Sequence, residues 1–248
     1  MRKLISLNIE GDKHLSLVRA FLEKESPDIL CLQEIFEEDI PTLTSLPQVI
    51  FMPMCLKERV DDTLSLRGIA ICSREAFTPA LQEYYHKPSE DLLREDCTTV
   101  ETRRATKREG VLSVTFPDGV HIATTHFTWI AEGALPDQNQ EADVALLLAI
   151  IEQHEPLLIC GDFNMPREQN FLYHVLTTAL VDHVPDRYTS SMHIPLHRVR
   201  NDPERAKHVS GFMVDYIFST PSSFAVENVR MECGMSDHCA LVADIEKI

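Results

Sequence analysis

The chain has 248 residues, of which 44% are hydrophobic and 25% are charged, values close to the average of globular proteins. Its net charge of −16 argues against a broad basic face for high-affinity duplex binding, because an acidic surface repels a phosphate backbone, and it favours binding of divalent cations. No low-complexity tract, repeat or flexible linker divides the chain, so we expect one domain over residues 1–248.

The N-terminus and the cysteines indicate in which cellular compartment the protein is found. Two basic residues precede only a very short apolar run, which does not fit a signal peptide, and no stretch approaches the ~20 apolar residues of a membrane-spanning helix. We therefore expect a cytoplasmic protein with no integral membrane segment. The seven cysteines are odd in number and form no Cys-x-x-Cys motif, which favours reduced thiols and excludes a zinc–thiolate site.

The first 34 residues read as a strand–helix–strand unit. Residues 2–9 alternate as a first strand, and residues 15–22 carry apolar side chains at helical spacing. Pro27 ends that helix, and residues 28–34 form a second buried strand that ends in a carboxylate.

The rest of the chain mixes strands, helices and charged loops. One helix begins near Asp137 and ends before Pro156, and a shorter helix covers residues 171–176. Residues 86–109 read as loops and exposed edges at the rim of a site, and residues 186–211 as a long loop. This mixture predicts a sheet-rich, layered α/β or α+β domain. The further strands are expected at residues 49–54, 69–72, 111–116, 120–126, 157–160, 214–219 and 239–245.

Several apolar runs end in residues that can hold a metal or move a proton. Function in α/β sheets gathers outside strand ends, at one edge. Oxygen ligands without Cys or paired-His spacing point to a hard cation such as Mg²⁺ or Mn²⁺ rather than zinc. The residues are Asn8, Glu34, His126, Asp162 with Asn164, and Asp237 with His238.

Each of these residues also has a structural explanation. Asp162 and Asn164 could form a turn by bonding their own backbone, and Asn8 could cap another turn. Glu34 could simply meet solvent at the end of its strand, and His126 could be a hydrogen-bonded core histidine.

Taken together, the motifs resemble those of the endonuclease/exonuclease/phosphatase superfamily. This resemblance runs from Asn8 to about Val242 and implies a DNase I-like four-layer sandwich, in which two packed mixed β-sheets are flanked by helices. The segment that begins Arg67-Gly68 also resembles the family's central strand. The motifs, in the family's order, are Leu32-Gln33-Glu34, Gly161-Asp162-Phe163-Asn164, Asp215-Tyr216-Ile217-Phe218 and Ser236-Asp237-His238.

The resemblance implies a metal site and a water-activating carboxylate. Glu34 would be the principal ligand of Mg²⁺ or Mn²⁺, with Asn8 and Asp237 beside it. Asp162, helped by Asn164, would orient or deprotonate the water that attacks phosphorus. Charge stabilisation by the metal and by hydrogen-bond donors would carry most of the rate.

The resemblance also implies roles for two histidines. His238 would contact the scissile phosphate and stabilise its charge, or carry a proton, while Asp215 would hold the tautomer of His238. His126 would donate to a phosphate oxygen. Abasic endonucleases of the exonuclease III type usually carry tyrosine at that position, so His126 and the acidic net charge argue against that branch.

Basic and aromatic residues are candidates for binding the rest of the substrate. Arg67 and two basic stretches could touch phosphate, and Trp129 could stack on a base or a lipid headgroup. The basic stretches are Arg103, Arg104, Lys107 and Arg108, and later Arg198, Arg200, Arg205 and Lys207. The alternatives are solvated loops for the arginines and core packing for the tryptophan.

These observations lead to one preferred function and two alternatives. The preferred function is a Mg²⁺- or Mn²⁺-dependent phosphodiesterase, a nuclease or a related enzyme, whose substrate is a phosphate ester such as a nucleic acid or a phospholipid headgroup. The first alternative is a phosphomonoesterase acting on a small phosphorylated metabolite or an inositol phosphate. The second is a binding module without catalysis.

Overall fold

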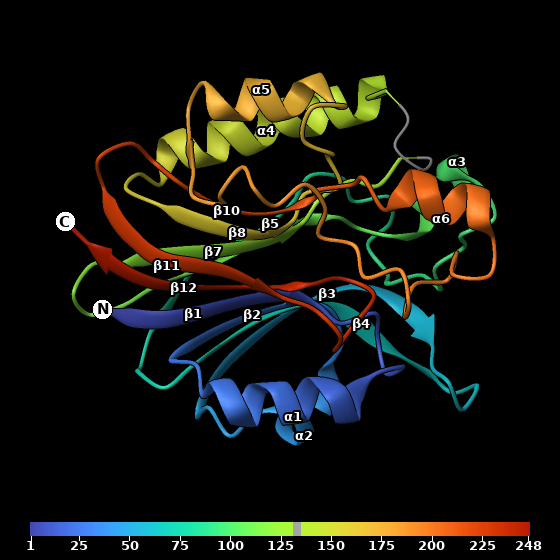
Figure 1. The fold of residues 1–248 in the computed structure, drawn as a ribbon, viewed down its shortest axis with the longest axis horizontal. Helices are drawn as coiled ribbons and strands as arrows, with labels where there is room; N and C mark the ends of the chain where they lie inside the picture. The colour runs from blue at the N-terminus through green and yellow to red at the C-terminus, as the bar shows by residue number, and fades with distance from the viewer. Residues whose placement is uncertain (131–134) are drawn as a thin grey trace.

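The computed structural model describes residues 1–130 and 135–248. Two six-stranded β-sheets pack face to face, and helices cover the outer face of each, so that four layers are stacked (Figure 1). In both sheets most neighbours are antiparallel, while β1–β2 and β7–β8 are parallel. The predicted DNase I-like sandwich of two mixed sheets is confirmed.

The first sheet contains the N-terminal strand at its centre, where its neighbours are β2 and β12. The register between β1 and β2 aligns Leu4 with Ile29 and Asn8 with Gln33, which confirms the predicted strand–helix–strand opening. The strand order is β11-β12-β1-β2-β4-β3, with β1 (Arg2–Asn8), β2 (Ile29–Phe36), β3 (Gln48–Glu58), β4 (Leu64–Ser73), β11 (Phe224–Glu232) and β12 (Ala240–Lys247).

In the second sheet, the strands expected at residues 111–116 and 120–126 pair as an antiparallel hairpin, in which Gly110 lies opposite His126. The last residue of β8, Asp162, lies opposite both His126 and Asp215. The order is β5-β6-β7-β8-β10-β9, with β5 (Thr78–Tyr84), β6 (Gly110–Thr115), β7 (His121–His126), β8 (Leu158–Asp162), β9 (Val181–Asp182) and β10 (Asp215–Ser219).

Helices cover both outer faces, and the strand alternation decides which core each side chain joins. Leu4 and Ile29 point between the sheets, whereas Ile5 and Leu30 point to the outer face and pack beneath Val18 of α1. Figure 1 shows α1 and α2 on one side and α4 and α5 on the other. The helices are α1 (Leu15–Glu25), α2 (Ile40–Leu43), α3 (Val100–Thr106), α4 (Gln138–Gln153), α5 (Phe171–Thr177) and α6 (Pro203–Val209), with a 3₁₀ turn at Glu37–Asp39.

Two charged stretches differ from their prediction as loops. Residues 86–109 contain α3, and Glu95 and Lys107 within them are buried, so the prediction of exposed edges is wrong there. The physical reason is mutual neutralisation, because Glu95 forms ion pairs with several cations. Residues 186–211 contain α6, whose N-cap Asp202 accepts a hydrogen bond from the backbone N–H of Arg205.

The hairpin of β11 and β12 brings two cysteines together. Cys233 and Cys239 form a disulfide, so the prediction that all thiols are reduced is wrong for this pair. The sequence shows neither the strand β11 nor its pairing with β12, and without that hairpin the two cysteines have no reason to meet. The other five cysteines are free.

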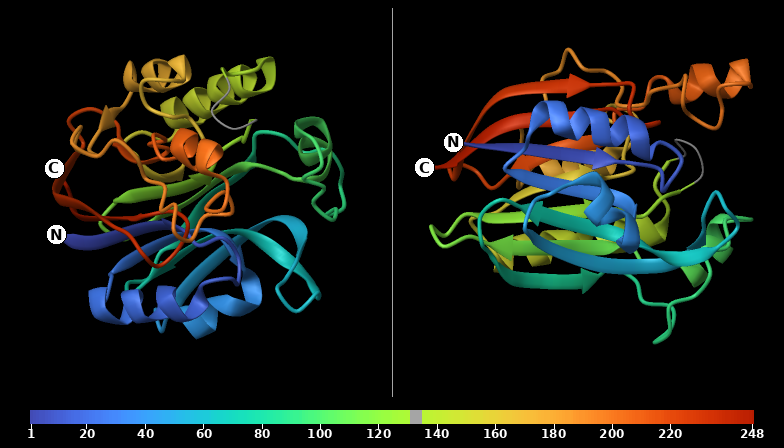
Figure 2. Two further views of the ribbon diagram at one scale, coloured as in Figure 1. Left: turned by 45° about the vertical axis from the view of Figure 1, so that its right-hand side comes forward. Right: turned by 90° about the horizontal axis from the view of Figure 1, so that it is seen from below.

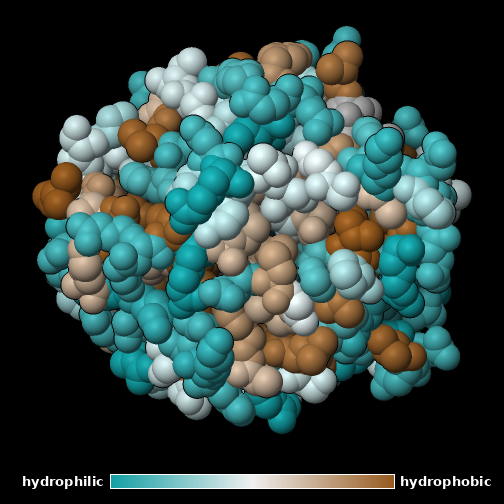
Figure 3. Space-filling view, in the orientation of Figure 1, coloured by the Kyte–Doolittle hydropathy of each residue, from teal (hydrophilic) through white to brown (hydrophobic). Residues whose placement is uncertain are grey.

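The outer surface is mixed in polarity. Hydrophilic side chains cover much of the face in Figure 3, with smaller apolar patches between them. Among the described residues, no helix is both long and apolar enough to cross a bilayer. The cytoplasmic location stays a prediction.

Candidate active site

Strand ends from both sheets converge at one edge of the sandwich, next to α3 and α6 and opposite the two chain termini (Figures 1 and 2). The parallel strands β1 and β2 end there in the first sheet, as do β7 and β8 in the second. Residues at or near these strand ends, together with Val214 just before β10 and the loop between β11 and β12, line a single cleft. The predicted residues that line it are Asn8, Glu34, Arg103, His126, Trp129, Asp162, Asn164, Asp237 and His238.

Glu34 occupies a β-bulge that turns its side chain toward the cleft. The pairing of β2 with β4 shifts between Gln33 and Ile35, and Glu34 has a φ of 57°. Its Oε2 accepts a hydrogen bond of 2.6 Å from Arg67. Burial opposes ionisation, but the charges of Arg67 and Lys107 hold the pKa of Glu34 well below its usual range. Glu34 is therefore an ionised carboxylate at neutral pH.

Arg67 is a buried support for Glu34. One guanidinium nitrogen contacts Glu34, and the other lies 2.5 Å from Glu95 Oε2. Lys57 and Arg103 also pair with Glu95, at 2.8 and 3.4 Å. Sequence reasoning missed Glu95, because a carboxylate in a charged stretch gives no sign of burial.

His126 lies between two carboxylates. Its Nε2 is 3.6 Å from Glu34 Oε1 and 3.7 Å from Asp162 Oδ2. Burial, joined by the charge of Lys107, lowers the pKa of His126 well below its usual value. The imidazole is therefore neutral at pH 7 and offers one N–H donor.

Asp162 is held at the end of β8 by two donors. Asn8 Nδ2 donates to Oδ2 at 3.0 Å, and the backbone N–H of Asn164 donates to Oδ1 at 2.9 Å. The second bond is the turn that the sequence also allowed. The side-chain amide of Asn164 donates to the carbonyl of Phe127 and so ties the turn to β7. Burial raises the pKa of Asp162 to about 6, and the carboxylate of Asp215 adds to the shift.

His238 and Asp215 form a buried pair. His238 Nδ1 donates to Asp215 Oδ2 at 2.8 Å, which leaves Nε2 facing the cleft at 3.8 Å from Asp162 Oδ2. Although burial opposes it, the carboxylates of Asp215 and Asp162 raise the pKa of His238 well above its usual value. The arrangement keeps a protonated imidazole beside a carboxylate. The N–H group at Nε2 of this imidazole can donate a hydrogen bond to an anionic phosphate.

Gly161 fits where no other residue does. Its φ is 144°, and a Cβ at this position would lie 2.0 Å from the carbonyl oxygen of Thr125 on β7. We expect Gly161→Ala to lower the free energy of unfolding by at least about 2 kcal/mol, because the clash involves backbone and φ is unfavourable. Urea unfolding followed by circular dichroism measures the change.

The matched control is Gly211→Ala. Gly211 has no positive φ, and a Cβ there would meet its neighbours at 3.8 Å, which is ordinary contact. Its free energy of unfolding should change by less than about 1 kcal/mol. Equal unfolding curves for the two variants would contradict the close packing of β8 against β7.

Two oxygen-rich sets could hold a cation. Asp162, Asp215 and His238 offer ligand atoms within 4.8 Å of one another. Within this set, Asp162 Oδ2 accepts a hydrogen bond from Asn8, and Asp215 Oδ2 accepts one from His238 Nδ1. The second set is Asn8, Glu34 and Asp237. Here burial raises the pKa of Asp237 to about 7, and the carboxylates of Glu10 and Glu34 add to the shift, so a divalent cation would relieve a real excess of negative charge.

The cleft extends beyond these groups. Trp129, Met192 and Phe212 form part of its wall. A second hollow adjoins the cleft, with Lys57, Glu58 and Arg59 in its lining, and the residues common to both are Glu10, Glu34, Arg103 and Arg198. Sequence reasoning missed Met192 and Phe212, which lie in and after the segment taken as a plain loop.

The structure places the predicted substrate-binding residues Arg103 and Trp129 at the cleft, and Arg104 away from it. The guanidinium of Arg103 stacks 4.7 Å above the ring of Trp129 at the cleft wall. Arg104 lies elsewhere and makes a two-pronged ion pair with Asp143 of α4, at 2.7 and 3.0 Å. The described lining of both hollows contains Arg103 and not Arg104. Arg104 therefore fastens α3 to α4.

Solved structures share this fold. An endonuclease/exonuclease/phosphatase from Bacteroides vulgatus has a TM-score of 0.67 at 16% identity, with 100% of this chain and 99% of that chain covered. A 3'-5' exonuclease from Neisseria meningitidis has a TM-score of 0.66 at 17% identity, with 98% and 99% covered. A mannosyl-6-phosphatase from Bacteroides thetaiotaomicron has a TM-score of 0.63 at 12% identity, with 99% and 100% covered.

The family is shown by a separate comparison. A search of curated proteins returned no match. The endonuclease/exonuclease/phosphatase family model matches residues 5–238, which include every strand-end residue described above. The chain therefore belongs to the endonuclease/exonuclease/phosphatase family, whose members hydrolyse phosphoric esters.

Proposed function

We propose that this protein is a divalent-metal-dependent phosphodiesterase. The observation that carries the proposal is the convergence of Glu34, His126, Asp162 and His238 from separate strand ends on one cleft. A cation site, a carboxylate with a raised pKa and a protonated imidazole are the groups that phosphate ester hydrolysis by water requires.

The shape of the cleft favours a diester over a monoester. A diester carries an organic group on each side of its phosphorus, whereas a small monoester carries one. The hollow walled by Trp129 and Phe212 adjoins a second hollow lined by Lys57 and Arg59, and the two share Glu34 in their lining. Both organic substituents of a diester therefore have room when its phosphate lies beside Glu34.

We assign the proton-handling roles to two side chains. Asp162, held by Asn8, accepts the proton of the attacking water, because its carboxylate lines the cleft and its pKa of about 6 leaves it ionised at neutral pH. His238, fixed by Asp215, donates from Nε2 to the phosphate or to the leaving oxygen. Neutral His126 adds a third donor.

We assign the cation to Asn8, Glu34 and Asp237. Their oxygen donors suit Mg²⁺ first and Mn²⁺ second, and the bound ion would neutralise charge that develops on a phosphoryl oxygen. Arg67 keeps the carboxylate of Glu34 oriented by occupying its Oε2 and leaving Oε1 toward the cleft.

Metal removal tests this proposal. Hydrolysis of bis(p-nitrophenyl) phosphate should fall to the background rate in EDTA and recover when excess Mg²⁺ is restored, because the oxygen-donor site would be emptied and refilled. p-Nitrophenyl phosphate, assayed in parallel for free phosphate, reports monoester hydrolysis. Diester turnover that survives chelation would contradict the metal site, and faster monoester turnover would replace the diesterase assignment by a phosphomonoesterase.

A panel of phosphodiester substrates would identify the natural substrate. Single- and double-stranded DNA, RNA, cyclic nucleotides and phospholipid headgroups should be compared with Mg²⁺ and with Mn²⁺. The acidic net charge leads us to expect weaker activity on long duplex DNA than on short or single-stranded substrates.

A further inference from the structure

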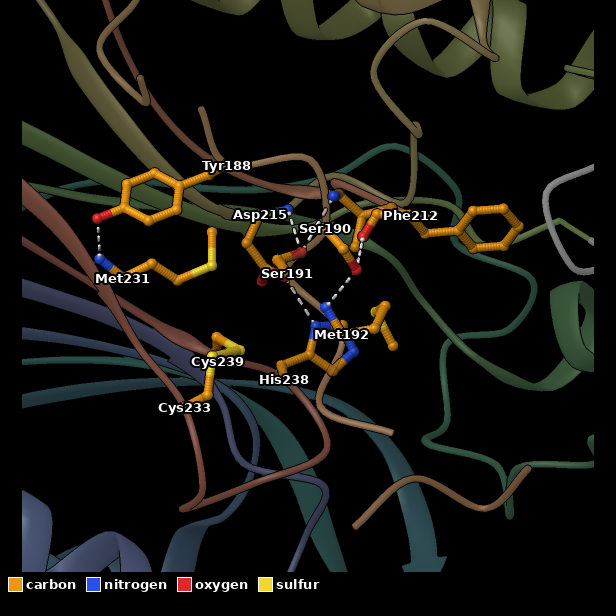
Figure 4. Close-up of a disulfide and its surroundings, with 11 residues drawn as sticks. Tyr188, Ser190, Ser191, Met192, Phe212, Asp215, Met231, Cys233, His238 and Cys239 are labelled. Atoms are coloured by element: carbon orange, nitrogen blue, oxygen red, sulfur yellow. Dashed lines mark hydrogen bonds and ion pairs between the residues drawn. A yellow bond between two sulfur atoms is a disulfide. The ribbon is translucent and has the colours of Figure 1, made fainter. Parts of the chain in front are cut away.

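A disulfide closes the loop that carries Asp237 and His238. Cys233 directly follows β11, Cys239 directly precedes β12, and their Cα atoms are 4.3 Å apart. Figure 4 shows the sulfur–sulfur bond at the base of this loop, beside the imidazole of His238. The bond joins the two ends of the segment 234–238, in which two of the proposed active-site residues lie.

The C-terminal half of the loop is also held by hydrogen bonds. The backbone N–H of His193 donates to the carbonyl of Asp237, and that of Cys239 donates to the carbonyl of Ser191, both at 2.7 Å. Met192 and His238 form an antiparallel bridge between these two bonds. These bonds join residues 237–239 to the neighbouring segment that contains Ser191, and the disulfide adds a covalent link from Cys239 to Cys233.

The N-terminal half has no such support. In the part of the chain that the structure describes, no backbone hydrogen bond joins residues 233–236 to another segment. Gly234 is exposed, has a φ of 106° and would meet nothing within 4 Å of an added Cβ. The disulfide and the burial of Met235 and Ser236 are what hold this half in place.

The same neighbouring segment also positions the partner of His238. The hydroxyl oxygen of Ser191 accepts hydrogen bonds from the backbone N–H groups of Val214 and Asp215, at 3.1 and 3.2 Å. Figure 4 shows Ser191 between Asp215 and His238. Movement of the 233–239 loop would therefore change the 2.8 Å contact between His238 and Asp215.

We propose that the Cys233–Cys239 disulfide is a positioning element of the active site, so that the enzyme works at full rate only when this bond is formed. The inference rests on the proposed roles of Asp237 and His238. Errors of about 1 Å in the position of a catalytic group cost about 10²-fold in rate, so a loosened loop has a large kinetic effect.

The bond is accessible to a reductant from one side. Cys233 is exposed, whereas Cys239 is buried. A dithiol attacks one sulfur as its thiolate, the protein S–S bond breaks, and the dithiol closes into a cyclic disulfide. Two electrons and two protons pass to the protein, which gains two cysteine thiols.

The experiment compares oxidised and reduced enzyme at saturating Mg²⁺. Alkylation under denaturing conditions followed by mass spectrometry should count the five free thiols before reduction and all seven cysteines after it. With bis(p-nitrophenyl) phosphate, kcat should fall by about 10- to 100-fold on reduction, with little change in KM, and should recover on reoxidation. Thermal melting confirms that the reduced protein is folded at the assay temperature.

Two variants act as controls. Cys233→Ser should be slow from the start and unaffected by the dithiol, which excludes an effect of the reductant on the metal. Cys97→Ser removes an exposed free thiol and should keep the wild-type ratio between oxidised and reduced rates. A reduced enzyme with seven thiols and an unchanged kcat would overturn the proposal, as would seven thiols in the protein before reduction.

Amide hydrogen exchange separates this inference from the proposed function. Exchange at residues 234–236 should become faster on reduction, whether or not a substrate is known. If no ester is hydrolysed in either state, the proposed function fails, and unchanged exchange would then overturn the positioning role as well.

Discussion

Replacement of His238 by Gln lowers kcat for diester hydrolysis by at least about 10²-fold, the usual cost of losing a positioned proton donor. Gln keeps a polar side chain but cannot carry the positive charge that Asp215 and Asp162 favour on the imidazole. KM should change less than kcat, because the charge on phosphate grows during the reaction.

The pH dependence gives a second readout of the same residue. In the wild type, kcat/KM should rise as pH increases through about 6, where Asp162 loses its proton, and should fall at alkaline pH, where His238 loses the proton it donates. In His238→Gln the alkaline fall should disappear, while the acid limb remains and moves to higher pH, because the charge of His238 no longer lowers the pKa of Asp162. Rates at 0.5-unit steps over roughly pH 4–10 measure both limbs.

His174→Gln is the matched control. His174 lies exposed on α5, on the outer side of the second sheet, so its loss should leave both kcat and the pH profile unchanged. Near-normal turnover in His238→Gln, with a profile like that of the control, would show that the proton donor lies elsewhere in the cleft.

The sequence predicts the centre of the site because strand ends concentrate function. Asn8, Glu34, His126 and Asp162 each follow an apolar run, and in two parallel pairs the carboxyl ends of strands must share an edge. Their meeting across two sheets is not visible in any local pattern. Only the ordered motifs, which resemble a family with a known sandwich, supplied that step.

The residues that hold the active-site side chains in place were less predictable, because their partners lie far away in the chain. Glu95 can be buried because cations from other parts of the chain, among them Arg67 and Lys57, pair with it. Arg104 has the composition of a phosphate contact, yet Asp143 of α4 binds it. The disulfide likewise follows from the pairing of β11, a strand with too little apolar periodicity to be recognised.

Glu34→Gln should weaken Mg²⁺ binding by at least about 100-fold and lower kcat/KM by at least about 10²-fold. The change keeps the shape of the side chain but removes the charge that makes it the principal ligand of our proposal. Arg67 then retains only Glu95 as a charged partner, which lowers stability, so the assay temperature must lie well below the melting midpoint of the variant. Titration calorimetry with Mg²⁺ measures the affinity without any substrate.

Glu37→Gln and Asp215→Asn decide how that result is interpreted. Glu37 is exposed, three residues further along the chain, and its replacement should leave Mg²⁺ affinity unchanged. Asp215→Asn should lower kcat through His238 while Mg²⁺ affinity stays near the wild-type value, because Asp215 belongs to the other oxygen-rich set. The opposite pattern, with normal Mg²⁺ binding in Glu34→Gln and weak binding in Asp215→Asn, would place the cation among Asp162, Asp215 and His238. Asp162 would then be a metal ligand and could not act as the free base. The raised pKa of Asp162 and its hydrogen bond from Asn8 are the observations that now favour the base role.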